Sequence, residues 1–160
     1  MTQSTQTTLS GAPEGFDAEL LMRELGAQGK PVVFVARDDR RLAEMRAALA
    51  FFGPSTLVFD FPAWDCVPYD RISPNPNVSS ARMATLAALR TGISGPFILL
   101  TTLNAVTQRL PARDVVASAV FQATVGKRIN EQELREFLVR MGFSQTPTVM
   151  EPGDYAIRGG

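Results

Sequence analysis

The sequence has no histidine and a single cysteine, Cys66. Without histidine, a serine or cysteine nucleophile has no imidazole base beside it, which excludes hydrolases of the Ser-His and Cys-His types. One cysteine cannot form an internal disulfide and supplies too few ligands for a structural zinc site. We therefore expect no catalytic residue and no metal site in this chain, and we interpret Cys66 as an inert, buried thiol.

Long apolar runs and an excess of one charge are also missing. The longest apolar runs, at 31–36 and 96–100, are far shorter than the ~20 residues of a membrane-spanning helix. The first ten residues are polar and do not form a secretory signal. The 16 cations balance the 16 anions, which argues against capture of nucleic acid by the whole surface. We expect a cytoplasmic protein with no membrane partner.

Helix and strand patterns alternate over the first 110 residues. Continuous β-branched and aromatic runs, typical of strands buried on both faces, occur at 31–36, 56–61 and 97–101. Helical spacing of apolar residues predicts helices at 16–27, from Asp38 or Asp39 to 52, from Ser79 or Ser80 to about 91, and at 103–109. Residues 62–78 are predicted to form a long loop. This alternation predicts an α/β fold with a parallel sheet.

The pattern changes after Pro111. Partial alternation at 115–125 predicts a strand of an antiparallel sheet. The run Asn130–Glu133 is a capping box, which opens a helix that ends at Gly142. We therefore expect a smaller α+β unit after the parallel sheet.

A hairpin is predicted at the end of the chain. Pro152 and Gly153 form a type II turn signal between a strand at 146–150 and a return strand through Tyr155. The chain stops where that return strand should extend, so we expect a piece of a longer protein. We divide it into a flexible segment (1–15), an α/β domain (16–112) and a truncated α+β subdomain (113–160).

The region before the first helix lacks the residues of a phosphate-binding loop. A P-loop would have the pattern GxxxxGK[ST], whereas this chain has SGAPEGF at 10–16. Phe16 follows Gly15, so the lysine for the phosphates and the hydroxyl for Mg²⁺ are missing. Glu14 would also repel a polyphosphate. The sheet is therefore expected to lack a competent nucleotide site.

The segment 61–74 concentrates unusual residues in one loop after a predicted strand. It contains the only tryptophan, Trp64, together with Tyr69 and several prolines. Such loops bind ligands in many α/β proteins, but the residues alone favour a structural role, in which Trp64 and Tyr69 close the edge of the sheet and the prolines stiffen the loop. Asp65 and Asp70 could serve acid–base or Mg²⁺ chemistry, although solvated surface carboxylates explain the same spacing.

Arg158 lies after the predicted turn and next to two glycines. An arginine flanked by small residues can be approached closely by the backbone or a carboxylate of a partner. An ordinary surface arginine explains the local sequence equally well.

Two blocks of the sequence resemble a known family. The first contains Trp64, Asp65, Pro68, Tyr69 and Asp70 in a W-[DE]-x-x-P-Y-[DE] pattern, and then Ser73-Pro74 and Ser79–Arg82. The second contains Val125–Ile129, Leu134, Gly142-Phe143 and Gly153–Gly160. The first block resembles the N-terminal region of the transcription-repair coupling factors (Mfd). The second is similar to a subdomain that these factors share with the excision-repair protein UvrB.

This resemblance implies a degenerate, P-loop-like helicase domain without a Walker A motif, followed by the start of a subdomain that binds UvrA. It also implies that Arg158, in the Y-x-x-R-G motif, contacts UvrA. Motor domains outside this chain would bind ATP and Mg²⁺, move along double-stranded DNA and displace stalled RNA polymerase. The segment itself would be a non-catalytic recruiting module without a cofactor.

Two other functions stay open. One alternative is a UvrB-like helicase fragment that binds DNA or a nucleotide, although the missing P-loop and the missing tyrosine-rich hairpin favour the coupling factors. The other is a scaffold that clamps on the motor domains and masks the UvrA surface.

Overall fold

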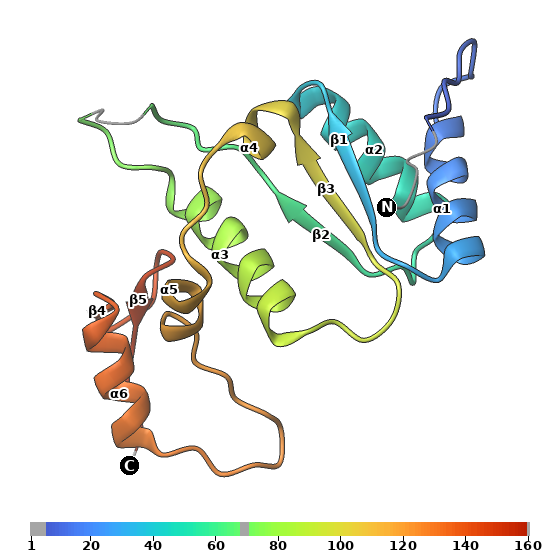
Figure 1. Ribbon diagram of the computed structural model, residues 1–160. Coiled ribbons are helices and arrows are strands. Elements are labelled where there is room, and N and C mark those ends of the chain that lie inside the picture. The colour runs from blue at the N-terminus through green and yellow to red at the C-terminus, as the bar shows by residue number, and fades with distance from the viewer. Residues whose placement is uncertain (1–5, 68–70, 160) are drawn as a thin grey trace.

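The computed structural model describes residues 6–67 and 71–159 (Figure 1). Its elements are α1 (Phe16–Gln28), β1 (Val32–Ala36), α2 (Asp39–Phe52), β2 (Val58–Phe61), α3 (Pro76–Thr91), β3 (Ile98–Thr102), α4 (Leu103–Thr107), α5 (Arg113–Ser118), α6 (Glu131–Arg140), β4 (Ser144–Gln145) and β5 (Asp154–Tyr155). The three strands predicted before residue 110 are all present. Within residues 6–67 and 71–159, no helix is long and apolar enough to cross a membrane.

The first three strands form a parallel sheet with β3 in the middle. Val32–Ala36 pairs with Ile98–Thr102 on one side, and Val58–Phe61 pairs with Ile98–Thr101 on the other. The predicted α/β class with a parallel sheet is therefore confirmed. Figure 1 shows the three strands side by side, with α4 directly after the carboxyl end of β3.

Helices α1 and α2 cover one face of this sheet. The buried core on that side consists of Ala18, Leu25, Met45, Leu49, Ile98 and Leu100. Helix α2 begins as predicted, because the Asp38 carboxylate accepts a hydrogen bond of 2.8 Å from the backbone N–H of Arg41. Such a cap satisfies an amide that the first turn of a helix leaves without a partner.

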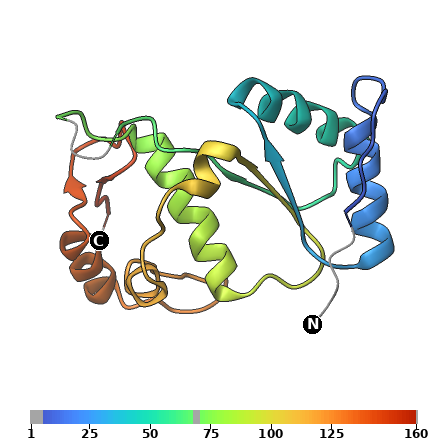
Figure 2. The same ribbon diagram turned by 45° about the horizontal axis from the view of Figure 1, so that its top comes forward.

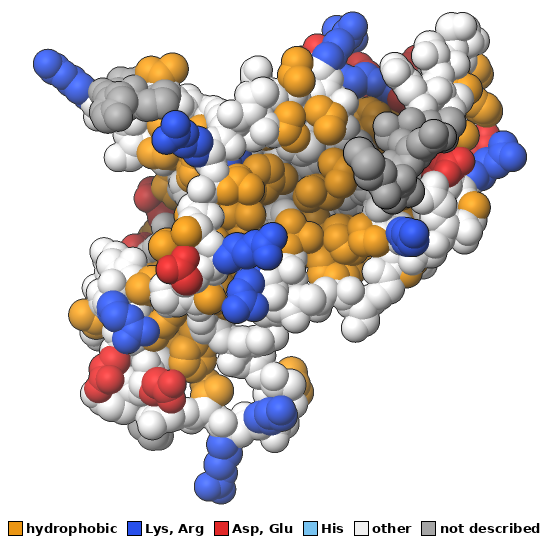
Figure 3. Space-filling view, viewed as in Figure 1, with side chains coloured by type: hydrophobic (Ala, Val, Ile, Leu, Met, Phe, Trp, Pro, Cys, Tyr) orange, Lys and Arg blue, Asp and Glu red, His pale blue; other side chains and the backbone are white. Residues whose placement is uncertain are grey.

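Strand β1 is buried on one face only. Val32 and Phe34 pack against the core, whereas Val33 and Val35 on the other face are 56% and 46% exposed. On that side of the sheet, α3 contacts β2, the strand on the opposite edge, so this face of β1 stays exposed. Figure 3 accordingly shows hydrophobic side chains gathered over the middle of the sheet. The prediction that β1 is buried on both faces is therefore wrong.

Helix α3 begins earlier than predicted. Asn75 caps it, and its side-chain oxygen accepts a hydrogen bond of 2.9 Å from the N–H of Asn77. Pro76 occupies the first helical position, where the missing N–H of proline costs nothing. The predicted cap at Ser79 or Ser80 is wrong, because both serines lie inside the helix.

The segment 115–125 is not a strand. Helix α5 begins at Arg113 and contacts α3, with Val116 buried, and the chain after residue 118 is irregular. A β-branched pair such as Val115 and Val116 favours a strand only where a sheet is available for pairing. Here the available neighbour is a helix. The predicted antiparallel strand is therefore wrong.

Helix α6 follows the prediction closely. The Asn130 side chain accepts hydrogen bonds from the N–H groups of Gln132 (3.0 Å) and Glu133 (3.3 Å). Gly142 follows the helix with a φ of 79°, a left-handed conformation that glycine adopts easily. Figure 2 shows α5, α6 and the last strands beside α3 and away from α1 and α2.

The last two strands differ from the predicted hairpin. The turn at Glu151–Asp154 closes as expected, with a hydrogen bond of 3.1 Å from the Asp154 N–H to the Glu151 carbonyl and a φ of 104° at Gly153. However, β4 and β5 pair in parallel, not antiparallel. Residues 146–150 are a connecting loop and not a strand, so the turn leads into β5 without joining two paired strands.

Candidate functional site

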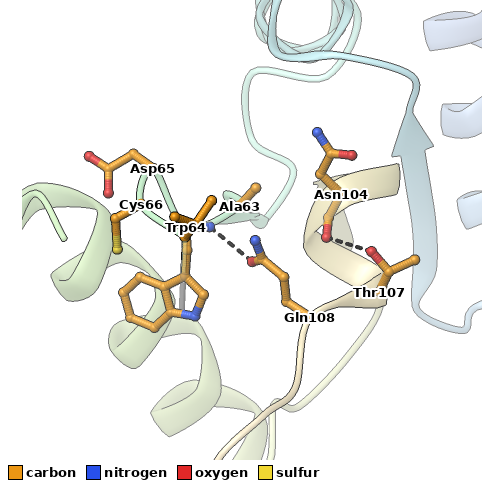
Figure 4. A pocket seen from close by; sticks show the side chains of 8 residues that line it. Ala63, Trp64, Asp65, Cys66, Asn104, Thr107 and Gln108 are labelled. Carbon is orange, nitrogen blue, oxygen red and sulfur yellow. Dashed lines mark hydrogen bonds between the residues drawn. The ribbon is translucent and has the colours of Figure 1, made fainter. Parts of the chain in front are cut away.

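The loop that follows β2 lies beside α4 at the carboxyl end of the parallel sheet. It borders an open cavity of about 460 Å³ (Figure 4). The lining residues are Ala63, Trp64, Asp65, Cys66, Val67, Asn104, Thr107 and Gln108. Cys66 lines this open cavity and is only half-buried. The prediction that Cys66 is a buried thiol is therefore wrong.

Arg82, from α3, is the side chain that holds this loop. It is 1% exposed, and its guanidinium carbon lies 4.2 Å from the ring centre of Phe61 and 4.4 Å from that of Trp64. A cation placed over aromatic faces is attracted to their π electrons, more strongly when water is excluded. Its Nη1 also donates a hydrogen bond of 2.6 Å to the Pro62 carbonyl. Arg82 therefore holds the loop in two ways, through its contact with the Trp64 ring and through its hydrogen bond to the Pro62 carbonyl.

Gln108, just after α4, completes the arrangement. Its Oε1 accepts a hydrogen bond of 2.9 Å from the Trp64 N–H and one of 3.2 Å from Arg82 Nη1. Figure 4 shows the Gln108 side chain reaching toward the Trp64 backbone. One amide oxygen thus joins the loop to α3 and to the end of α4.

Arg82 has no carboxylate partner in the described part of the chain, and its buried Nε has no hydrogen-bond partner there. Burial lowers the pKa of the Arg82 guanidinium, because desolvation penalises the charged form. The aromatic faces and the two oxygen acceptors offset this penalty. The arrangement is suited to holding a loop in place.

The signature residues have structural roles where the structure describes them. Trp64 stacks on Arg82, and the Asp65 carboxylate accepts hydrogen bonds of 3.1 and 3.2 Å from the N–H of Asn75, which caps α3. Pro68, Tyr69 and Asp70 lie outside the described residues, so the pairing of Asp65 with Asp70 is not tested. Arg82 and Gln108 were not identified as site residues from the sequence. The S-x-R pattern of the first block is a signal for Arg82, but no pattern marks Gln108.

Two carboxylates lie at the start of α1, where a P-loop protein binds phosphates: Glu14 just before the helix and Asp17 in its first turn. Gly15 has a φ of 82°, and the Phe16 N–H bonds to the Pro13 carbonyl over 3.2 Å. Asp17, in the first turn, forms an ion pair with Arg41 of α2. Among residues 6–15 no strand precedes the helix. This geometry differs from the strand–loop–helix arrangement of a P-loop.

Arg158 lies after β5 on the exposed surface of the C-terminal elements. Its Nη2 donates hydrogen bonds to the Pro147 carbonyl (2.8 Å) and to the Thr148 hydroxyl (3.1 Å). Both acceptors are neutral, so the positive charge of Arg158 is not compensated by them.

Fold and site together define an α/β segment with a small mixed unit attached to it. No family model matches the chain. Curated relatives do: it is 31% identical to the transcription-repair-coupling factor of Myxococcus xanthus over 157 residues, which are 94% of this chain and 13% of that protein. It is 30% identical to the factor of Escherichia coli K12 over 142 residues (89% and 12%) and 30% identical to that of Rickettsia bellii over 127 residues (79% and 11%).

The resemblance to the transcription-repair coupling factors is confirmed by these matches, which extend over 79 to 94% of this chain. The matched part is only 11 to 13% of the length of the relatives.

Proposed function

We propose that this chain is a non-catalytic module of a cytoplasmic transcription-repair coupling factor and that it recruits UvrA to lesions where RNA polymerase has stalled. Its whole protein would hydrolyse ATP with Mg²⁺ in motor domains outside this chain and act there on double-stranded DNA and RNA polymerase. The observation that carries the proposal is the exposed Arg158 in a chain related to the coupling factors.

The surroundings of Arg158 support a role in binding a partner. No carboxylate of residues 6–67 or 71–159 pairs with it, whereas Arg135 pairs with Glu131 on α6. Its charge is therefore available to an acidic group of UvrA. A charge-assisted hydrogen bond is worth about 1.5–3 kcal/mol when water is excluded from it.

We also propose that the chain has an N-terminal segment (1–15), a degenerate helicase-like domain (16–112) and a UvrA-binding subdomain that begins at 113. The proposal is supported by the position of α5, α6 and the β4–β5 pair on the outer side of α3 (Figure 2).

Calorimetric titration with purified UvrA tests the proposal, using both this chain and a form extended at its C-terminus. Arg158→Ala is expected to weaken binding by about tenfold or more, because the charged contact is lost. Arg135→Ala is the matched control, since it removes the same charge from an exposed helix face nearby. Wild-type affinity in the Arg158→Ala variant of the extended form would contradict the assignment of Arg158.

Titration with ATP and Mg²⁺ tests the alternative of a nucleotide-binding helicase fragment. We expect no binding, since the turn before α1 carries Glu14 and lacks the lysine and the hydroxyl of a P-loop. ATP binding that changes on mutation of the Pro13–Phe16 turn would favour the alternative.

A further inference from the structure

The guanidinium group of Arg158 is held by the loop that connects β4 to β5. Two acceptors from this loop, the Pro147 carbonyl and the Thr148 hydroxyl, lie 2.8 and 3.1 Å from the same atom, Nη2. An exposed arginine without such contacts moves among many rotamers, and fixing it on binding costs conformational entropy. Arg158 already makes such contacts within its own chain, so less of this entropy is left to lose on binding.

The connecting loop is itself tied at both ends. At its start, the Thr146 N–H bonds to the Tyr155 carbonyl (2.9 Å), and the Thr146 hydroxyl bonds to the Thr148 carbonyl (3.0 Å). At its other end, the Asp154 carboxylate accepts a hydrogen bond of 3.2 Å from the Met150 N–H. The acceptors for Arg158 are therefore positioned by the β4–β5 pair and by the turn that follows.

We infer that Thr148 is a positioning residue for the contact between Arg158 and the partner. This inference rests on the proposed function, in which Arg158 meets an acidic side chain of UvrA. Because the Pro147 carbonyl and the Thr148 hydroxyl both bind Nη2, either Nη1 or Nε can donate a single hydrogen bond to a carboxylate of the partner. Because both loop acceptors are neutral, they orient the guanidinium without cancelling its charge.

The expected gain in affinity follows from the cost of ordering a long side chain. Immobilising such a side chain at an interface weakens binding by about two- to tenfold when the ordering happens on association. Thr148 reduces this cost before the partner arrives. Removal of its hydroxyl should therefore weaken UvrA binding by about two- to tenfold, less than the loss of Arg158 itself.

UvrA titration of the full chain and of its C-terminally extended form tests this inference. Thr148→Val removes the hydroxyl and should lower affinity about two- to tenfold, whereas Thr148→Ser should keep the wild-type value. In an Arg158→Ala background, Thr148→Val should have no further effect, because the residue acts through Arg158. Thr91→Val, at the end of α3, is the matched control for the loss of an exposed threonine hydroxyl. Equal affinity of Thr148→Val and wild type, or an equal loss in the Arg158→Ala background, overturns the inference.

A measurement on the unbound chain separates this inference from the proposed function. The Arg158 Nε–H should be ordered in nuclear magnetic resonance relaxation, become mobile in Thr148→Val and become ordered again in Thr148→Ser. Relaxation that does not depend on Thr148 overturns the positioning role even where UvrA binds. If these relaxation changes occur but neither wild-type form binds UvrA, the proposed function fails and the inferred role in binding fails with it.

Discussion

Replacement of Arg82 tests whether a buried cation holds the loop after β2. Arg82→Ala removes a side chain packed between Phe61 and Trp64 and leaves the Pro62 carbonyl without its donor. A buried large-to-small change costs about 2–5 kcal/mol, and an unpaired buried carbonyl costs about 1–3 kcal/mol. Relief of the desolvation penalty of the unpaired guanidinium offsets part of this loss. We expect the free energy of unfolding to fall by about 3 kcal/mol.

Arg82→Met separates packing from charge. Methionine keeps most of the volume between the two rings and carries no charge to desolvate, but it cannot donate to the Pro62 carbonyl or to Gln108. The expected loss is about 1 kcal/mol, clearly smaller than that of the alanine variant. A matched control is Arg40→Ala on α2, where an exposed i,i+4 ion pair to Glu44 contributes less than about 0.5 kcal/mol.

Urea unfolding followed by circular dichroism measures these differences, and fluorescence reports the loop itself. Trp64 is the only tryptophan of the chain, and its ring lies against Arg82. Its emission should shift to longer wavelength in Arg82→Ala, because the indole becomes more exposed to water. An Arg82→Ala variant within 1 kcal/mol of wild type, with unchanged Trp64 emission, would refute the reasoning.

Three further predictions concern local features of the fold. Asn130→Ala should destabilise the chain by about 1 kcal/mol in urea unfolding, because it removes the cap of α6, whereas Asn130→Asp should not. The backbone N–H of Arg41 lowers the pKa of the Asp38 carboxyl. The stability that the ionised Asp38 carboxylate contributes is fully present above its pKa in the unfolded chain, about 3.9, and is lost as the pH falls through its lower pKa in the folded chain. Thermal unfolding below about pH 4 should therefore depend less on pH in Asp38→Asn. Val33→Thr on the exposed face of β1 should change stability by less than about 1 kcal/mol, whereas Leu100→Ala in the core should cost about 2–5 kcal/mol; urea midpoints compare the two.

The parallel sheet could be predicted because its strands are short apolar runs separated by helices with capping residues. The extent of burial could not be predicted in the same way. Val33 and Val35 are as apolar as Val32 and Phe34, yet one pair faces α1 and α2 and the other is largely exposed. Whether Val33 and Val35 are covered depends on where α3 packs, and α3 packs against β2, at the other edge of the sheet.

The C-terminal errors have a related cause. Asn130 and Gly142 act through hydrogen bonds and backbone angles within a few residues, so their roles follow from the local sequence. The helical conformation at Val116 and the choice of the strand that pairs with β4 depend instead on contacts with elements that are distant in the sequence. The type II turn at Pro152-Gly153 is local and was predicted, but the direction of the strand that follows it is a property of the whole connection from 146 to 153.

Arg82 and Arg158, one from each family block, show why a motif alone does not define a site. Arg82 is 1% exposed, stacked between two rings and hydrogen-bonded to its own loop, so a partner cannot reach it. Arg158 is exposed, and its hydrogen bonds within the described residues go to a carbonyl and a hydroxyl, neither of which carries a charge. Substitutions at the two positions should therefore change different properties of the chain, stability at Arg82 and UvrA affinity at Arg158. Arg82→Met should lower stability and leave UvrA affinity unchanged under conditions where it is folded, and Arg158→Ala should lower affinity and leave the urea midpoint unchanged. If either variant lost both stability and UvrA affinity, the loop after β2 and the C-terminal surface would form one site.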